Sequence, residues 1–197
     1  MKLNLTTWLM GKGKLDVGFN FDLSASNGAF SYNGKLHEMD GKVMNRITKP
    51  LGMVQINRAK VKDMAFSIKA DSYRSAGTMA FRFNDLSVAM LKKDTEKNKL
   101  VRQGLISFLA NNLIIYSDNP SADKKFTRAV INYTRPETAS FFSFIWRSLF
   151  TGIKYSVGVT PAKESAIRSK IAQFEQMKVD RTQRRETREM RKRMRNR

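Results

Sequence analysis

The residues that indicate the fold class most clearly are Leu15-Asp16-Val17-Gly18-Phe19-Asn20-Phe21-Asp22-Leu23-Ser24. Apolar residues alternate in this stretch with polar residues or glycine. A period of two is typical of a β-strand that buries one face and exposes the other. The following Ser26-Asn27-Gly28 predicts a tight hairpin turn, and residues 29–36 then repeat the alternation less regularly. We therefore expect a β-meander in this part of the chain.

Further strands are predicted by the same alternation downstream. Residues 54–61 and 64–70 indicate two strands, and residues 126–133 indicate the last one. Residues 79–83 alternate in one phase and residues 86–90 in the other, which is typical of a bulge or short break within one long strand. The chain is therefore expected to be mainly β and antiparallel.

Several segments between these strands carry weaker signals. Residues 40–52 look like a linker, and residues 92–99 look like a polar loop. Residues 100–116 fit a helix or a buried strand equally well, and Asp118-Asn119-Pro120 predicts a turn. The sequence therefore does not determine how the predicted strands are connected.

The character of the chain changes after Pro136. Aromatic and apolar residues at roughly helical intervals predict a helix within residues 136–158. Thr160-Pro161 is a good helix start, because proline is favoured at the first helical position. Arginine dominates the last residues, so we expect residues 159–197 to form a long basic helix or solvated tail. This division gives a sheet domain at 1–135, an aromatic helix at 136–158 and a basic tail at 159–197.

Composition limits the classes of function. The chain has 197 residues, of which 37 are Lys or Arg and 17 are Asp or Glu, giving a formal net charge of +20. So large a positive charge favours partners with dense negative charge, namely an anionic membrane surface or nucleic acid. The absence of cysteine excludes disulfides and thiol catalysis. The sequence contains no conventional membrane-spanning helix and no signal peptide, so we expect no export signal in this chain.

No arrangement of residues indicates an enzyme, a metal site or a cofactor. His37 is the sole histidine, and without cysteine or a second histidine a metal site there is improbable. The carboxylates are scattered, and no motif places a base beside a serine or threonine nucleophile. Gly11-Lys12-Gly13-Lys14 lacks the spacing of a phosphate-binding loop and favours a turn. We therefore expect a non-catalytic protein.

Several stretches resemble the C-terminal region of AsmA-like proteins of Bacteroidota cell envelopes. The similar segments are Ile47-Thr48-Lys49-Pro50-Leu51-Gly52, Gly77 to Leu91 with its Asp85-Leu86-Ser87-Val88, Leu109-Ala110-Asn111-Asn112, Asn119-Pro120 and Ser140-Phe141-Phe142-Ser143-Phe144-Ile145-Trp146-Arg147-Ser148-Leu149-Phe150-Thr151-Gly152-Ile153-Lys154. The last of these is the most specific.

This resemblance implies membership of the repeating-β-groove superfamily. Such proteins look like long curved sheets whose apolar inner face shields lipid tails between two membranes, and they are usually anchored in the inner membrane. The chain departs from that pattern because it lacks the anchor and most of the repeated sheet. We expect a curved antiparallel sheet of roughly six to eight strands forming an open groove. An aromatic amphipathic helix and a long basic C-terminal helix follow it.

The resemblance assigns a lipid-lining role to the apolar face of the sheet. The alternation alone favours a closed sandwich core, because any half-buried sheet shows it. The resemblance makes the lipid-lining interpretation equally favoured. The candidate groove residues are Leu15, Val17, Phe19, Phe21, Leu23, Met64, Phe66, Ile68, Met79, Phe81 and Phe83.

The aromatic segment has two interpretations. It is either a buried helix that caps the open end of the sheet or an interfacial helix with its aromatic residues at the headgroup boundary. The candidate membrane-interface residues are Phe141, Phe142, Ile145, Trp146, Arg147, Leu149, Phe150 and Lys154.

The basic tail is by default a solvated segment, but it fits an anionic membrane or a partner protein as well. Specific nucleic-acid binding is not favoured, because no aromatic residues are interleaved with the arginines. The tail candidates are Arg184, Arg185, Arg188, Arg191, Lys192 and Arg193. Phospholipid or an anionic membrane surface is therefore the expected partner. The resemblance implies other envelope proteins as further partners and a location on the periplasm-facing side of the inner membrane.

Overall fold

The computed structural model describes residues 1–94, 99–102 and 115–195. It divides into two compact units, residues 1–159 and residues 160–197. The first unit contains β1 (Lys2–Leu9), β2 (Gly13–Phe21), β3 (Phe30–Leu36), β4 (Met39–Asp40), a 3₁₀-helix (Gly41–Met44), α1 (Asn45–Gly52), β5 (Val54–Ala70), β6 (Arg74–Asp94), β7 (Lys99–Arg102), β8 (Arg128–Thr134) and α3 (Phe141–Ser156). The second unit is the single helix α4 (Pro161–Arg195).

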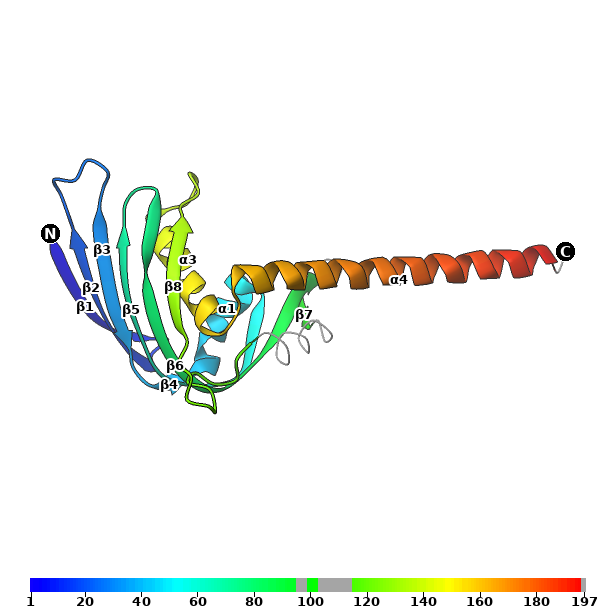
Figure 1. Cartoon of the computed structure of the whole chain (residues 1–197), viewed down its shortest axis with the longest axis horizontal. Coiled ribbons are helices and arrows are strands. Elements are labelled where there is room, and N and C mark those ends of the chain that lie inside the picture. The colour runs from blue at the N-terminus through cyan, green and yellow to red at the C-terminus, as the bar shows by residue number, and fades with distance from the viewer. Residues whose placement is uncertain (95–98, 103–114, 196–197) are drawn as a thin grey trace. The chain divides into compact units, whose positions relative to one another are not determined.

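The strands form one open antiparallel sheet, which confirms the predicted mainly β class at 44% strand and 31% helix. Its order is β1-β2-β3-β5-β6, and β8 pairs with the first part of β6. β7 pairs with the far end of β6, from Leu91 to Asp94. The long strands β5 and β6 bend, and α1 and α3 lie within the resulting curve (Figure 1).

Strand β5 is continuous, so the prediction of separate strands at 54–61 and 64–70 is wrong. The alternation changes phase between them because the pairing of β5 with β6 shifts register between Ile56 and Asp63. Asp85 on β6 has a positive φ of 55° in the same region. The phase change within residues 79–90 is therefore an irregularity in one long strand, as predicted.

Two predicted connections also differ. Residues 40–52 are not a linker, because a 3₁₀-helix and α1 occupy most of them. The Asn27-Gly28 turn is not a tight two-residue hairpin, since β2 ends at Phe21 and β3 begins at Phe30. Gly28 does adopt a positive φ of 66° within this longer loop. In the predicted polar loop at 92–99, Lys92–Asp94 belong to β6 and Lys99 begins β7, while residues 95–98 lie outside the described residues.

The ambiguous segment and the turn after it are described in part. Residues 99–102 of the ambiguous segment form β7, and residues 103–114 lie outside the described residues. In the predicted turn, Asn119 pairs with Phe83 of β6 through two backbone hydrogen bonds, and its side-chain amide donates to the carbonyl oxygens of Phe81 and Thr127. Asn119 is 1% exposed, so the loop is attached firmly to the sheet.

A short connection leads from β8 into α3. The guanidinium of Arg135 donates to the Ala139 carbonyl oxygen at 2.7 and 3.0 Å and lies 5.6 Å from the centre of the Phe144 ring. The Ser140 hydroxyl caps α3 by accepting a hydrogen bond from the Ser143 amide. These contacts fix the turn between β8 and α3, and α3 then packs on β8 and β6.

Candidate functional site

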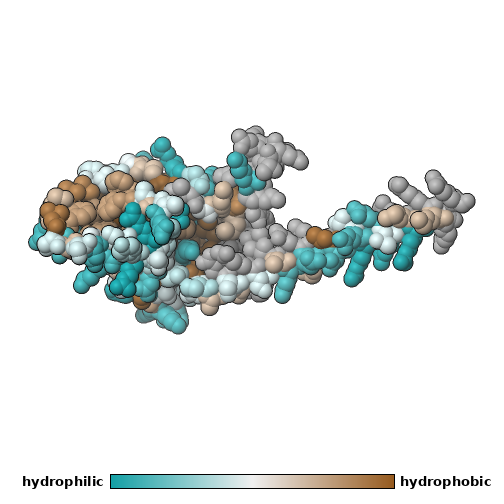
Figure 2. Space-filling view, turned by 90° about the horizontal axis from the view of Figure 1, so that it is seen from above, coloured by the Kyte–Doolittle hydropathy of each residue, from teal (hydrophilic) through white to brown (hydrophobic). Residues whose placement is uncertain are grey.

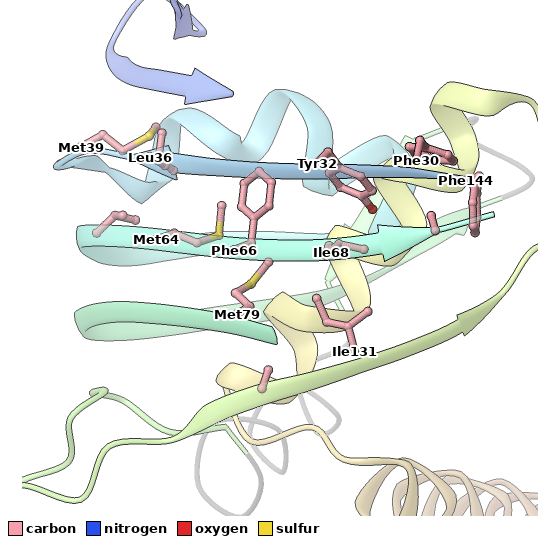
Figure 3. Packing of buried hydrophobic residues seen from close by; sticks show 13 residues of the cluster. Phe30, Tyr32, Leu36, Met39, Met64, Phe66, Ile68, Met79, Ile131 and Phe144 are labelled. Atoms are coloured by element: carbon pink, nitrogen blue, oxygen red, sulfur yellow. The ribbon is translucent and has the colours of Figure 1, made fainter. Parts of the chain in front are cut away.

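One face of the sheet is apolar from strand to strand, because directly opposed residues of antiparallel strands share a face. A typical row runs from Leu3 on β1 through Phe19, Tyr32 and Ile68 to Ile131 on β8, with Gly77 of β6 between the last two. The neighbouring row begins with Leu5 and includes Val17, Gly34, Phe66, Met79 and Ala129. Figure 3 shows side chains of β3, β5 and β6 from these rows next to one another.

Helix α3 covers one half of this apolar face. A Cβ atom on Gly152 would lie 2.7 Å from Ile131 Cδ1 and 2.9 Å from Met79 Cε, so the helix approaches β6 and β8 closely at this glycine. The buried hydroxyls of Ser75 and Ser148 are 2.7 Å apart and join the sheet to the helix. Phe144, also on α3, is 1% exposed beside Phe30. This half is an ordinary closed core.

The other half of the apolar face is open. Along the row from β8 to β1, the exposed fraction is 0% at Ile131, 1% at Ile68 and 1% at Tyr32. Phe19 is half-buried, and Leu3 at the edge is 46% exposed. Leu5 in the neighbouring row is 44% exposed. The apolar surface therefore runs out from the core to an uncovered edge, and apolar side chains gather at the end of the unit that carries β1 and β2 (Figure 2).

Aromatic rings mark the boundary between the covered and the open half. Phe19 stacks on Tyr32 with ring centres 5.8 Å apart, and Phe21 stacks on Phe30 at the same distance. Phe141, at the start of α3, lies 5.3 Å from Phe30. The first turn of the helix therefore ends the covered region over β2 and β3.

The structure separates the predicted groove residues into three groups. Met64, Phe66, Ile68, Met79 and Phe83 are buried in the core and are not available to a ligand in this arrangement. Leu23 is 79% exposed beyond the end of β2, so it does not extend the strand alternation as predicted. The half-buried residues of the apolar face are Leu15, Val17, Phe19, Phe21 and Phe81.

Strand β1 adds two candidates that the sequence analysis missed. Leu3 and Leu5 alternate with Lys2, Asn4 and Thr6, which is a detectable strand signal. Trp8 interrupts it, because this large apolar residue occupies a position on the polar face and is 59% exposed.

The opposite face of the sheet is polar. Asp16 accepts a hydrogen bond from the Thr6 hydroxyl at 2.7 Å, lies 3.0 Å from His37 Nε2 and pairs with Lys14 at 3.3 Å. The hydrogen bonds from Thr6 and His37, in that order, lower the pKa of Asp16 to about 2. Ion pairs such as Asp63–Arg82 lie on the same sheet. The two faces are therefore chemically distinct at adjacent residues of one strand.

The predicted interface residues occupy different sides of α3. Phe142 is 80% exposed and Arg147 is also exposed. Trp146 and Phe150 stack with ring centres 6.1 Å apart, and both are half-buried. The remaining candidates are also half-buried: Phe141, Ile145, Leu149 and Lys154. Helix α3 therefore packs on β8 and β6, while Phe142 and Arg147 are exposed at different positions around it.

The second unit carries the basic candidates on one helix. Arg184, Arg185, Arg188 and Arg191 are exposed. The side chains of Lys192 and Arg193 lie outside the described residues. Among the described residues, no helix is long and apolar enough to cross a membrane, and no group of acidic or histidine side chains is arranged to hold a metal ion.

No known family matches the chain. A scan against protein-family models found no match, and neither a curated protein nor a solved structure is significantly similar to it. The resemblance to AsmA-like proteins therefore remains a prediction.

Tyr32 places an unsatisfied hydroxyl in the core. Its oxygen is buried and has no hydrogen-bond partner among the described residues. Burial raises the pKa of Tyr32 to about 12, and the nearby Ser148 hydroxyl acts in the opposite direction. The Ser148 hydroxyl donates to the Phe144 carbonyl oxygen and lies 2.7 Å from the Ser75 hydroxyl.

We expect Tyr32→Phe to leave the free energy of unfolding unchanged or to raise it by up to about 1 kcal/mol, because a buried hydroxyl without a partner is costly. Ser148→Ala should instead lower it by about 1–3 kcal/mol, since it leaves Ser75 unpaired in the core. Urea unfolding followed by circular dichroism measures both changes. A strong loss of stability in Tyr32→Phe would contradict this assignment.

Proposed function

We propose that this chain is the C-terminal part of an AsmA-like cell-envelope protein and binds phospholipid acyl chains without catalysing a reaction. The observation that carries the proposal is the gradient of exposure along the apolar rows, from 0% at Ile131 to 46% at Leu3. Each methylene group that leaves water contributes about 0.8 kcal/mol to binding. An acyl chain lying along β1 and β2 would bury the apolar side chains that α3 does not cover.

The proposed binding surface is smaller than the sequence predicts. It comprises Leu3 and Leu5 of β1 with Leu15, Val17 and Phe19 of β2. The alternative interpretation of the alternation, a closed core, accounts for the half of the apolar face beneath α3. It leaves unexplained a contiguous apolar surface at the edge of the sheet, and such surfaces are typical of binding sites.

In this proposal, α3 and α4 attach the protein to a membrane surface. Phe142 is 80% exposed, and an aromatic side chain of this kind contributes most at the headgroup boundary. Arg147 is exposed in the adjacent turns of the same helix and would contact phosphate groups. The exposed arginines of α4 add attraction of about 1 kcal/mol each near an anionic leaflet. The proposed setting is the periplasm-facing side of the inner membrane, in lipid transport or outer-membrane biogenesis.

Native mass spectrometry of the full chain, purified in a mild detergent, tests the lipid site. We expect co-purified phospholipid, and we expect its loss in Val17→Asp and in Phe19→Asp, because a carboxylate on the open surface excludes acyl chains. Asn20→Asp is the matched control, since Asn20 neighbours Phe19 in sequence but is exposed on the polar face. Circular dichroism confirms that each variant is folded. Lipid-free wild-type protein, or equal loss in the control, would contradict the proposal.

Flotation with anionic vesicles at low salt tests the attachment to membranes. Phe142→Ala should weaken binding about tenfold, because it removes the apolar group that enters the interface. Phe126→Ala is the control, since Phe126 is an exposed phenylalanine in a loop. Replacing Arg184, Arg185, Arg188 and Arg191 with glutamine should weaken binding further and reduce its dependence on salt. Binding of the protein to RNA or DNA but not to vesicles would contradict membrane attachment through α4.

A further inference from the structure

A shallow hollow of about 380 Å³ lies on the polar face of the sheet, over β1, β2 and β3. Two neighbouring rows of opposed residues form its walls: Asn4, Gly18 and Asn33 in one row, and Thr6, Asp16 and Lys35 in the other. The residues between these rows form its floor and belong to the apolar face: Leu5, Val17, Gly34 and Phe66. The hollow is formed by the face of the sheet and not by its edge, so it does not depend on what borders β1.

Gly18 opens the hollow at its centre, and the sheet itself gives no reason for a glycine there. A glycine within a strand weakens the strand, and it often marks a bulge, a sharp bend, or a place where a ligand or another backbone approaches. The pairing of β2 with β1 and with β3 is continuous through Gly18, which excludes a bulge. The nearest atoms to the point where a Cβ would lie are the side-chain oxygens of Asn4 and Asn33, at 3.1 and 3.4 Å. No backbone atom of the described residues lies as close, so the approach of a ligand is the remaining reason for this glycine.

The walls of the hollow carry hydrogen-bonding groups that the protein itself does not use. Within the described part of the chain, the carboxamides of Asn4 and Asn33 have no hydrogen-bond partner, and the ammonium group of Lys35 has no ion-pair partner. A carboxamide offers both a donor and an acceptor, whereas an ammonium group offers donors alone. Sites that bind small ligands fix their orientation with a few polar groups of this kind.

Asp16 adds an acceptor whose position is fixed. Its carboxylate accepts a hydrogen bond from the Thr6 hydroxyl at 2.7 Å, lies 3.0 Å from His37 Nε2 and pairs with Lys14 at 3.3 Å. These contacts hold the side chain in place, and a carboxylate retains lone pairs for further donors. Its negative charge disfavours an anionic ligand.

Trp8 continues the line of the hollow along β1. It is 59% exposed on the same face as Asn4 and Thr6, which it follows at alternate positions. At about 3.4 Å per residue, Asn4 and Trp8 are roughly 14 Å apart along the strand. Among the described residues, no aromatic ring stacks on the indole and no cation lies over it. A large, flat apolar group is therefore exposed beside a polar hollow.

We propose that this hollow binds a short saccharide, with hydroxyl groups bonded to its polar side chains and one sugar ring stacked on Trp8. Each hydroxyl group both donates and accepts, so a ligand with many hydroxyls satisfies carboxamide, ammonium and carboxylate groups together. The C–H groups on the face of a sugar ring pack well on an indole, which combines a large apolar surface with a polar edge. An acyl chain does not fit, because the walls contain no large apolar side chain. The inference goes beyond the proposed function and does not rest on it, since the two ligands would lie on opposite faces of the sheet.

Saturation-transfer difference NMR of the full chain with maltotriose, cellotriose and tri-N-acetylchitotriose tests the site. These sugars are neutral, so attraction to the net charge of +20 does not contribute. We expect saturation transfer to at least one of them. Trp8→Ala and Gly18→Val should each weaken its binding about tenfold, because the first removes the stacking surface and the second fills the hollow. Tyr73→Ala is the matched control, since Tyr73 is an aromatic residue that is 72% exposed in the turn between β5 and β6.

Thermal unfolding of Gly18→Val separates a ligand site from a packing requirement. A β-branched residue is favoured in strands, so this variant should unfold at the same temperature as the wild type or at a higher one. A clearly lower unfolding temperature would mean that the sheet itself requires glycine here, and it would overturn the proposal. The absence of saturation transfer from the wild-type protein, or unchanged binding in Trp8→Ala and Gly18→Val, would overturn it as well.

Discussion

The close packing of α3 on β6 and β8 is the contact on which the rest of the first unit depends. Gly152 allows the helix to touch Ile131 and Met79, and the Ser75–Ser148 hydroxyl pair fixes its position along the sheet. A helix is too narrow to cover a sheet of this width, because neighbouring strands lie about 4.8 Å apart and a helix is about 10 Å across. The packing that closes one half of the apolar face therefore leaves the other half open.

Because the strands are in register, the part of the apolar face that α3 covers and the part that it leaves exposed are continuous. The rows that begin at Leu3 and Leu5 keep their alignment from β1 to β8, so the open surface and the closed core are parts of one apolar face. The polar face carries Asp16 and its partners at the neighbouring positions of β2. A ligand that is apolar along its length can therefore bind only the apolar face of the sheet. That face ends at the edge strand β1.

Periodicity alone predicts much of this fold. The alternation from Leu15 to Phe21 gives β2, and the phase change near Asn84-Asp85 correctly indicates an irregular long strand. Periodicity does not predict how deeply a side chain is buried, because burial depends on contacts between residues that are distant in the sequence. Phe19 and Phe66 have the same pattern in the sequence, but Phe66 is in the core because its strand lies at the centre of the sheet, whereas Phe19 lies one strand from the edge. Leu23 continues the alternation but lies past the last pair of β2, so nothing packs against it.

In the proposed function, acyl chains contact the open half of the apolar face. A phospholipid with a photoreactive diazirine in its acyl chain, irradiated with the wild-type protein and mapped by peptide mass spectrometry, tests this without any mutation. We expect adducts on Leu3, Leu5, Val17 and Phe19. Adducts on Asn4, Asp16 and Asn20 of the polar face, or no adducts on β1 and β2, would contradict it.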